Sequence, residues 1–121
     1  MSSRKLQNYL RAHRKRSRLS QNDVASLVGT QTGASISRYE RFRRQPTLQT
    51  ALAYEVIFGV PAQELFPGVF EGVKKATLAR ANTLAEELRA LPSARRPVHK
   101  LNLLQEILAR SQSENQVHTL S

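Results

Sequence analysis

The sequence predicts an all-α fold, with five short helices in the first two-thirds of the chain and a helical extension after them. Every apolar run in the 121 residues has the helical spacing that places side chains on one face. Serine or threonine precedes several of these runs as a capping residue, and glycine follows two of them as a stop signal. No Asn-Gly or similar hairpin signal occurs, so the sequence leaves no segment for a β-sheet.

The first two helices can be placed from local signals. Residues 6–16 carry an apolar face and a basic outer side, which predicts the first helix. Ser20 gives the best helix start in the chain, because Asp23 follows at the spacing of a capping box and adds an acid to the positive first turn. Gly29 can take the left-handed conformation that ends this second helix.

Three further helices are expected before residue 67. Apolar residues at intervals of three predict a short third helix over about residues 32–41, with Thr32 able to cap it. Thr47 is the predicted N-cap of a fourth helix that ends at Gly59. Pro61 suits the first turn of a brief fifth helix.

The chain changes character after Pro67 and Gly68, a pair that predicts a break. Residues 69–91 form one long amphipathic pattern, and a second follows over about residues 98–108, beyond a linker bracketed by two prolines. From Ser111 the sequence is polar, which predicts disorder. We therefore expect a domain over residues 1–67, a C-terminal helical region over 68–110 and a disordered tail over 111–121.

Charge indicates the class of partner. The chain has 19 Lys and Arg against 9 Asp and Glu, a formal net charge of +10, which favours a polyanion such as nucleic acid. Residues 1–67 hold 11 of these bases and 4 of the acids, so the charge belongs mainly to the first domain. No run approaches the roughly 18 apolar residues of a membrane span. With zero Cys and no apolar core of a secretory signal, a cytoplasmic location is expected.

The sequence does not favour an enzyme or a cofactor. Its three His are far apart and have no Cys or acidic companion at ligand spacing. No serine has a matching His and Asp arrangement, and no glycine-rich phosphate loop precedes a helix. The basic first helix lacks the broad apolar face with Trp or Phe that membrane-surface helices carry. We therefore expect no catalytic site, no metal, no cofactor and no membrane.

Several landmarks of the first two-thirds fall into the register of one known family. Ser-Gln opens the second predicted helix and Gly closes it, Ile-Ser precedes an aromatic-Glu-Arg, a basic loop precedes Pro, and Gly-Val precedes Glu-Leu-Phe. Over about residues 6–66 the chain resembles the phage-repressor and Cro kind of helix-turn-helix, also called the XRE family. The resemblance implies a five-helix domain in which the second and third helices bind double-stranded DNA, with the third in the major groove.

The resemblance also implies roles for single residues. Gln21, at the start of the second helix, is similar to a residue that contacts a phosphate, and the exposed N–H groups of a helix start favour an anion there. Arg14 and Glu40 match an arginine and a glutamate that pair in similar proteins, so we expect them to tie the first helix to the third. Phosphate contacts are further expected from Gln31, Thr32, Arg43 and Arg44.

The residues expected to face the bases come from early in the third helix: Gly33, Ala34, Ser35, Ser37 and Arg38. Arg38 can bond O6 and N7 of guanine at once, which is worth about 1–3 kcal/mol of discrimination. The alternatives for Arg38 are a phosphate contact and a free surface arginine. Gly33 and Ala34 are small enough for close approach to a thymine methyl, or serve only a tight start of the helix. Arg43 and Arg44 would fix the register on the DNA backbone without reading sequence.

Three departures from the family pattern stand out. One extra residue lies between Gly29 and Ile36, which leaves the reading register of the third helix open. Arg18 and Phe42 stand where the family often has Gly, so each position needs either a different turn or a non-Gly residue with positive φ. Glu55 stands where a small apolar residue is usual, and a buried carboxylate there would need a partner.

The C-terminal helical region offers a surface for a second copy. We expect dimerisation through Val73, Leu84, Leu88, Leu91, Leu101, Leu104 and Leu108. The alternative is that both helices fold back on the first domain.

The function that follows is a sequence-specific transcriptional regulator, a repressor or autoregulator, bound to an inverted repeat as a homodimer that spans two half-sites. Two other functions remain open. One is an antitoxin or adaptor whose C-terminal helices bind another protein. The other is an architectural DNA binder of low specificity.

Overall fold

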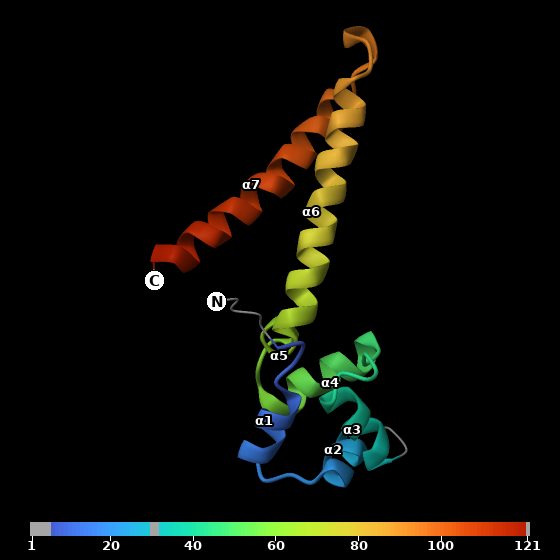
Figure 1. The fold of residues 1–121 in the computed structure, drawn as a ribbon, viewed down its shortest axis with the longest axis vertical. Coiled ribbons are helices and arrows are strands. Elements are labelled where there is room, and N and C mark those ends of the chain that lie inside the picture. Colours follow the sequence, from blue (N-terminus) through green and yellow to red (C-terminus); the bar gives the residue numbers. More distant parts are fainter. Residues whose placement is uncertain (1–5, 30–31, 121) are drawn as a thin grey trace. The chain divides into compact units, whose positions relative to one another are not determined.

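The computed structural model describes residues 6–29 and 32–120, with side chains through residue 112. These ranges contain α-helices and one short 3₁₀ helix and no strand, which confirms the all-α prediction (Figure 1). The chain divides into two compact units, residues 1–71 and 72–121. The division falls a few residues after the predicted boundary at residue 67.

The first helix, α1 (Leu10–Arg16), begins later than the sequence predicts, because Asn8 holds the chain before it. The buried side chain of Asn8 accepts a hydrogen bond from Leu10 N (3.1 Å) and donates one to Tyr39 O (2.9 Å). The first bond satisfies one of the N–H groups that a helix start leaves without a helical partner. The second ties the segment to the end of the third helix.

The second helix, α2 (Gln21–Val28), has the capping box that its sequence predicts. Asp23 N donates to Ser20 Oγ and Ser20 N donates to Asp23 Oδ2, both at 2.9 Å. The hydrogen bond from Ser20 N lowers the pKa of Asp23. The ionised Asp23 carboxylate therefore stabilises the fold above the ordinary pKa of Asp, and this stabilisation is lost as the pH falls through the lowered pKa of Asp23. Gly29 ends the helix with φ at 88°, as predicted.

Three helices complete the first unit: α3 (Gly33–Glu40), α4 (Leu48–Phe58) and α5 (Ala62–Leu65). Thr47 caps α4 by accepting a hydrogen bond from Thr50 N at 3.2 Å. Gly59 ends α4 in the left-handed region. Both ends of α4 confirm the prediction.

The cap of α5 comes from the preceding helix. Pro61 stands before α5, whereas the sequence predicts it inside the first turn. Ala62 N donates a hydrogen bond to Glu55 Oε1 at 2.8 Å. The partner that a carboxylate at position 55 requires is therefore the backbone at the start of α5.

Arg18 and Phe42 both take positive φ, at 60° and 64°. Of the two alternatives given for these positions, the structure therefore has the non-Gly residue with positive φ and not a different turn. Each lies two residues beyond a helix end, at α1 and at α3. Leu19 N donates to Arg14 O, and Arg43 N donates to Arg38 O. This pattern is the Schellman motif, which satisfies the last carbonyl groups of a helix and usually carries glycine at the strained position.

The core of the first unit draws side chains from all five of its helices. The largest fully buried ones are Leu10, Val24, Ile36, Tyr54 and Leu65. The ring of Tyr54 stacks on Phe58 and meets the edge of Phe66, with centroids 5.9 Å and 6.3 Å away. Its buried hydroxyl has no hydrogen-bond partner among the residues that the structure describes. Burial raises the pKa of Tyr54 well above its usual range, with the Glu40 carboxylate adding to the effect.

The Tyr54 hydroxyl predicts a stabilising substitution. Tyr54→Phe is expected to raise the free energy of unfolding by about 1 kcal/mol. The reason is that a buried hydroxyl without a hydrogen-bond partner destabilises the folded state, and the substitution removes that hydroxyl. Urea denaturation followed by circular dichroism measures the change. Tyr9→Phe, at an exposed ring, is the matched control and should stay within about 0.5 kcal/mol. A loss of stability in Tyr54→Phe would show that the hydroxyl has a partner.

The predicted break at Pro67 and Gly68 is wrong, because the long helix α6 (Pro67–Arg89) starts at that proline. Proline is favourable as the first residue of a helix, where its missing N–H costs nothing. Gly68 N donates to Leu6 O at 2.8 Å. A Cβ on Gly68 would lie 2.5 Å from that same oxygen. Gly68 therefore lets the N-terminal segment lie directly against the start of α6.

This close contact predicts that Gly68→Ala lowers the free energy of unfolding by about 1–3 kcal/mol, because backbone must move to admit the methyl group. Gly72→Ala is the matched control in the same helix, since a Cβ there meets nothing within 4 Å. The control should be neutral or stabilising by up to about 1 kcal/mol. Equal effects of the two substitutions in urea denaturation would contradict the assignment.

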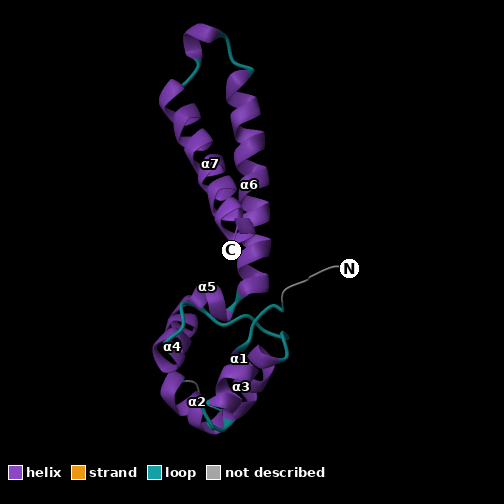
Figure 2. Ribbon diagram, turned by 90° about the vertical axis from the view of Figure 1, so that its left-hand side faces the viewer, coloured by secondary structure: helices purple, strands orange, loops and turns teal. Residues whose placement is uncertain are grey.

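The second unit is a hairpin of two helices. Residues 81–88 of α6 pack against residues 101–108 of α7 (Val98–Leu120), and a turn that holds the 3₁₀ helix η1 (Ser93–Arg95) joins the two helices (Figure 2). Farther from the turn the two helices diverge (Figure 1). The core between them contains Ala81, Ala85, Leu88, Leu101, Leu104, Ile107 and Leu108.

This core includes some of the residues predicted for dimerisation, which itself stays a prediction. Four of the predicted residues, Leu88, Leu101, Leu104 and Leu108, pack between α6 and α7 of the same chain. Within this core Ala81, Ala85 and Leu104 are buried, and the other members are partly buried. Val73, Leu84 and Leu91 remain exposed.

The end of the chain also differs from its prediction. α7 continues to Leu120, so residues 111–120 are helical, where their polar composition predicts disorder. No Pro or Gly follows Pro97, so nothing in the sequence interrupts the helix. No helix of the described ranges is long and apolar enough to cross a membrane.

Candidate nucleic-acid interface

The start of α3 is fixed by α2. Gly33 N donates a hydrogen bond to Asn22 Oδ1 at 3.2 Å. Thr32, which the sequence predicts as the cap, makes no side-chain capping bond. A Cβ on Gly33 would overlap Asn22 Oδ1, so the small size of Gly33 serves a tight start of the helix. Contact of Gly33 with a thymine methyl stays a prediction.

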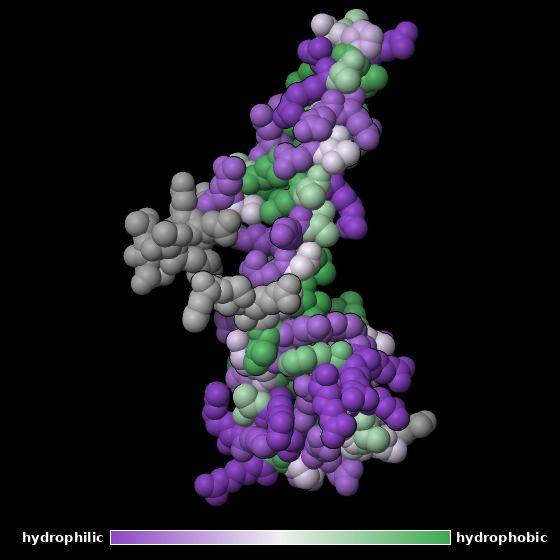
Figure 3. All heavy atoms as spheres, in the orientation of Figure 1, coloured by the Kyte–Doolittle hydropathy of each residue, from purple (hydrophilic) through white to green (hydrophobic). Residues whose placement is uncertain are grey.

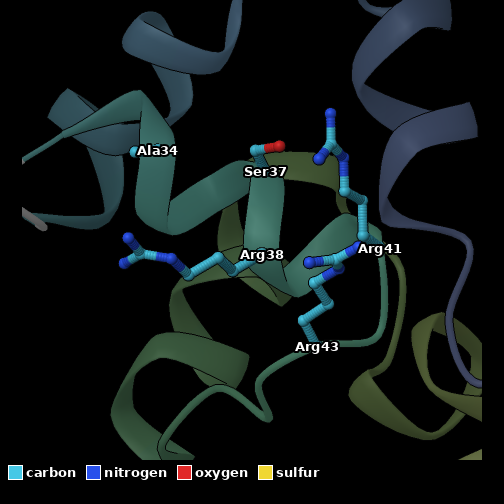
Figure 4. Close-up of a pocket in the computed structure, with 5 residues that line it drawn as sticks. All are labelled: Ala34, Ser37, Arg38, Arg41 and Arg43. Atoms are coloured by element: carbon cyan, nitrogen blue, oxygen red, sulfur yellow. The ribbon is translucent and has the colours of Figure 1, made fainter.

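The outward face of α3 forms a shallow concavity with the turn that follows it. Its lining residues are Ala34, Ser37, Arg38, Arg41 and Arg43 (Figure 4). Four of these were predicted from sequence as DNA contacts, and the structure brings them together. Arg41 was not predicted as a site residue, although it belongs to a basic cluster that the sequence shows.

The other predicted contacts lie elsewhere. Gly33 and Ser35 are half-buried and do not line the concavity. Thr32 and Arg44 are exposed outside it. Gln31 lies outside the described residues.

Positive charge is concentrated around this concavity. Arg38, Arg41 and Arg43 are exposed, and within the described ranges none of them forms an ion pair. The visible face of the first unit is mainly hydrophilic (Figure 3). Three guanidinium groups without acidic partners create a local positive potential, which attracts a polyanion.

The geometry of the turn is set by the backbone. Arg43 N donates to Arg38 O at 2.9 Å, and Phe42 N donates to Tyr39 O at 3.1 Å. These bonds fold the chain back on the last turn of α3. Arg43 is therefore held at a fixed place relative to Arg38, which lies on the helix itself.

The predicted pair of Arg14 and Glu40 forms and is nearly buried. Arg14 Nε lies 2.6 Å from Glu40 Oε2, and Arg14 Nη2 donates to Glu40 Oε1 at 3.1 Å. The exposed fractions of the two side chains are 12% and 3%. The hydrogen bond that Arg14 donates to the Glu40 carboxylate raises the pKa of Arg14 above its usual value. A fork of two charge-assisted bonds thus fixes α1 against α3.

Gln21 belongs to the same network. Its Nε2 donates a hydrogen bond to Glu40 Oε1 at 3.2 Å. The Glu40 carboxylate, which belongs to α3, therefore accepts hydrogen bonds from both α1 and α2. The amide carries two N–H groups, and this bond uses one. The other remains compatible with the predicted phosphate contact.

This arrangement defines a class of protein. Residues 10–65 match the model of a helix-turn-helix family. No curated protein and no solved structure matches the chain. The first unit therefore contains a DNA-binding helix-turn-helix domain, in which α2 and α3 are the two helices of the motif.

The model that residues 10–65 match is that of the phage-repressor and Cro-like helix-turn-helix family, the XRE family. That family consists of DNA-binding regulators of transcription and not of enzymes. The resemblance inferred from the sequence over residues 6–66 is confirmed.

Proposed function

We propose that the protein is a sequence-specific regulator of transcription, a repressor or autoregulator, that binds an inverted repeat as a homodimer with α3 in the major groove. The concavity on α3 carries this proposal, because it joins a helix face with small side chains to three unpaired guanidinium groups. The major groove of B-DNA admits an α-helix and presents a distinct pattern for each base pair.

The arginines differ in the role that their positions support. Arg38 projects from α3 itself, so its guanidinium can reach the O6 and N7 atoms of a guanine when the helix enters the groove. Arg41 and Arg43 follow the end of the helix and border the concavity. From there they can hold the phosphate groups that flank the groove, which positions the domain without reading sequence.

In this proposal the second unit forms the homodimer. A single recognition helix reads only a few base pairs, and dimers of this class bind half-sites about 34–36 Å apart. The hairpin of α6 and α7 leaves Val73, Leu84 and Leu91 exposed after its own core has formed. An exposed apolar surface of this kind is consistent with a partner.

Selection from a pool of random DNA duplexes tests the proposal. The full chain should enrich an inverted repeat, and fluorescence anisotropy should show at least about 10³-fold weaker binding to a random duplex at the same salt. Arg95→Ala, in η1 of the second unit, removes one exposed positive charge and is the control for charge alone. Equal competition by random DNA would overturn sequence specificity and support an architectural role.

A further inference from the structure

We infer that α6 pairs with α6 of a second copy in antiparallel orientation, about a two-fold axis that passes between Thr83 and Leu84. The inference rests on the homodimer of the proposed function and assigns the surface that forms it. All residues that carry it lie in the second unit.

The exposed apolar side chains of α6 form a stripe of their own. Val73, Leu84 and Leu91 are 59%, 45% and 37% exposed, and Arg80 and Glu87 lie between them at spacings of seven, four, three and four residues. At about 100° per residue these positions share one side of the helix. The stripe that faces α7, with Ala81, Ala85 and Leu88, lies roughly a quarter of a turn away. We call the first stripe the outer face.

A shallow depression lies at the centre of the outer face. Ala79, Arg80, Thr83, Leu84 and Glu87 line it. Thr83 Oγ1 donates to Ala79 O at 3.1 Å, so its hydroxyl is satisfied within the helix. Ala79 and Thr83 are the small side chains of this depression, and they permit close approach of a second backbone there.

The outer face of one α6 is complementary to the outer face of a second α6 that runs in the opposite direction. An axis between Thr83 and Leu84 places Arg80 opposite Glu87 of the partner subunit, and Glu87 opposite Arg80 of the partner subunit. The same operation places Thr83 against Leu84 of the partner subunit, and Ala76 against Leu91 of the partner subunit. Opposite charges meet, and each larger side chain meets a smaller one.

This self-complementarity favours a second copy over another protein. A two-fold interface uses the same patch on both subunits, so each contact must occur twice. Within the described residues neither Arg80 nor Glu87 forms an ion pair inside its own chain. A parallel pair in register would instead place Arg80 against Arg80 of the partner subunit, which like-charge repulsion disfavours.

Charge reversal in the full chain tests this orientation. Arg80→Glu and Glu87→Arg should each weaken the dimer about tenfold or more, because each creates two like-charge contacts in the homodimer. A one-to-one mixture of these two variants should recover the dimer as a heterodimer, since both contacts then join opposite charges. Sedimentation velocity over a concentration series measures the dissociation constants.

Two controls separate the outer face from general effects. Lys75→Glu reverses one charge on the opposite side of α6, and Leu103→Lys changes an exposed leucine of α7. Both should leave the dimer unchanged, while Leu84→Lys should dissociate it. Circular dichroism of every variant confirms that the helices are retained.

The outcomes distinguish this inference from the proposed function. A dimeric full chain that withstands both charge reversals, or a mixture that remains monomeric, overturns the antiparallel pairing and leaves the homodimer in place. A monomeric full chain overturns both. Binding to a duplex that holds a single half-site is measured in parallel and reports on α3 alone. If the unmodified chain does not bind that duplex, the DNA-reading role of α3 is overturned instead.

Discussion

Glu40→Ala is expected to lower the free energy of unfolding by about 3–5 kcal/mol, the usual result of breaking a buried ion pair from one side. The substitution leaves the guanidinium of Arg14 nearly buried and without its two bonds to the carboxylate. It also removes the acceptor of Gln21 Nε2, so the mutual placement of α1, α2 and α3 loses a shared contact. Urea denaturation of the full chain measures the change.

The double variant Arg14→Leu/Glu40→Leu separates the energy of the interaction between the two side chains from the effect of removing each one alone. Removing both charges together leaves no buried charge uncompensated, so the double variant should lose clearly less stability than the sum of the losses in Arg14→Leu and Glu40→Leu. Glu64→Ala, at an exposed acid of α5, is the control and should stay within about 0.5 kcal/mol. Additive losses would show that the two side chains act independently.

The second large effect is expected on DNA binding. Arg38→Ala should reduce the preference for one or two base pairs of the selected site by about 1–3 kcal/mol. Arg43→Ala should weaken binding to all sequences alike and reduce the slope of log K against log salt by about one unit. The difference arises because a base contact carries sequence information and a phosphate contact does not.

Fluorescence anisotropy with the selected site, its single-base variants and a random duplex distinguishes the two roles at several salt concentrations. Arg41→Ala should behave like Arg43→Ala, because both side chains follow the end of α3. Arg95→Ala provides the control for loss of one charge. Identical behaviour of Arg38→Ala and Arg43→Ala would contradict the division into a base-reading and a phosphate-binding arginine.

Features that depend on neighbours in sequence could be predicted without the structure. The capping box of Ser20 and Asp23 spans three residues, and the glycine that ends α2 follows it directly. The helix stops at Arg18 and Phe42 were expected to be unusual, because the family often has Gly at both positions. The physical reason for their strain, a Schellman motif at each helix end, is also local.

Contacts between distant segments could not be predicted in this way. Asn8 bonds a carbonyl 31 residues away, and Asn22 caps a helix that starts 11 residues later. Neither asparagine stands in a recognisable motif, since the partner is a backbone group whose position depends on the whole fold. The core leucines of α6 and α7 show the same limit, because amphipathic spacing predicts a buried face but does not identify the helix that buries it.

The two sides of α3 carry separate tasks. Ile36, Tyr39 and Glu40 face inward and hold the domain together, whereas Ala34, Ser37 and Arg38 border the solvent-facing concavity. Ala34 and Arg38 are exposed, so under the proposed function the DNA sequence that α3 reads can change at these positions without a change in the buried side of the helix. A regulator built in this way can diverge rapidly in its target after duplication while its fold remains constant.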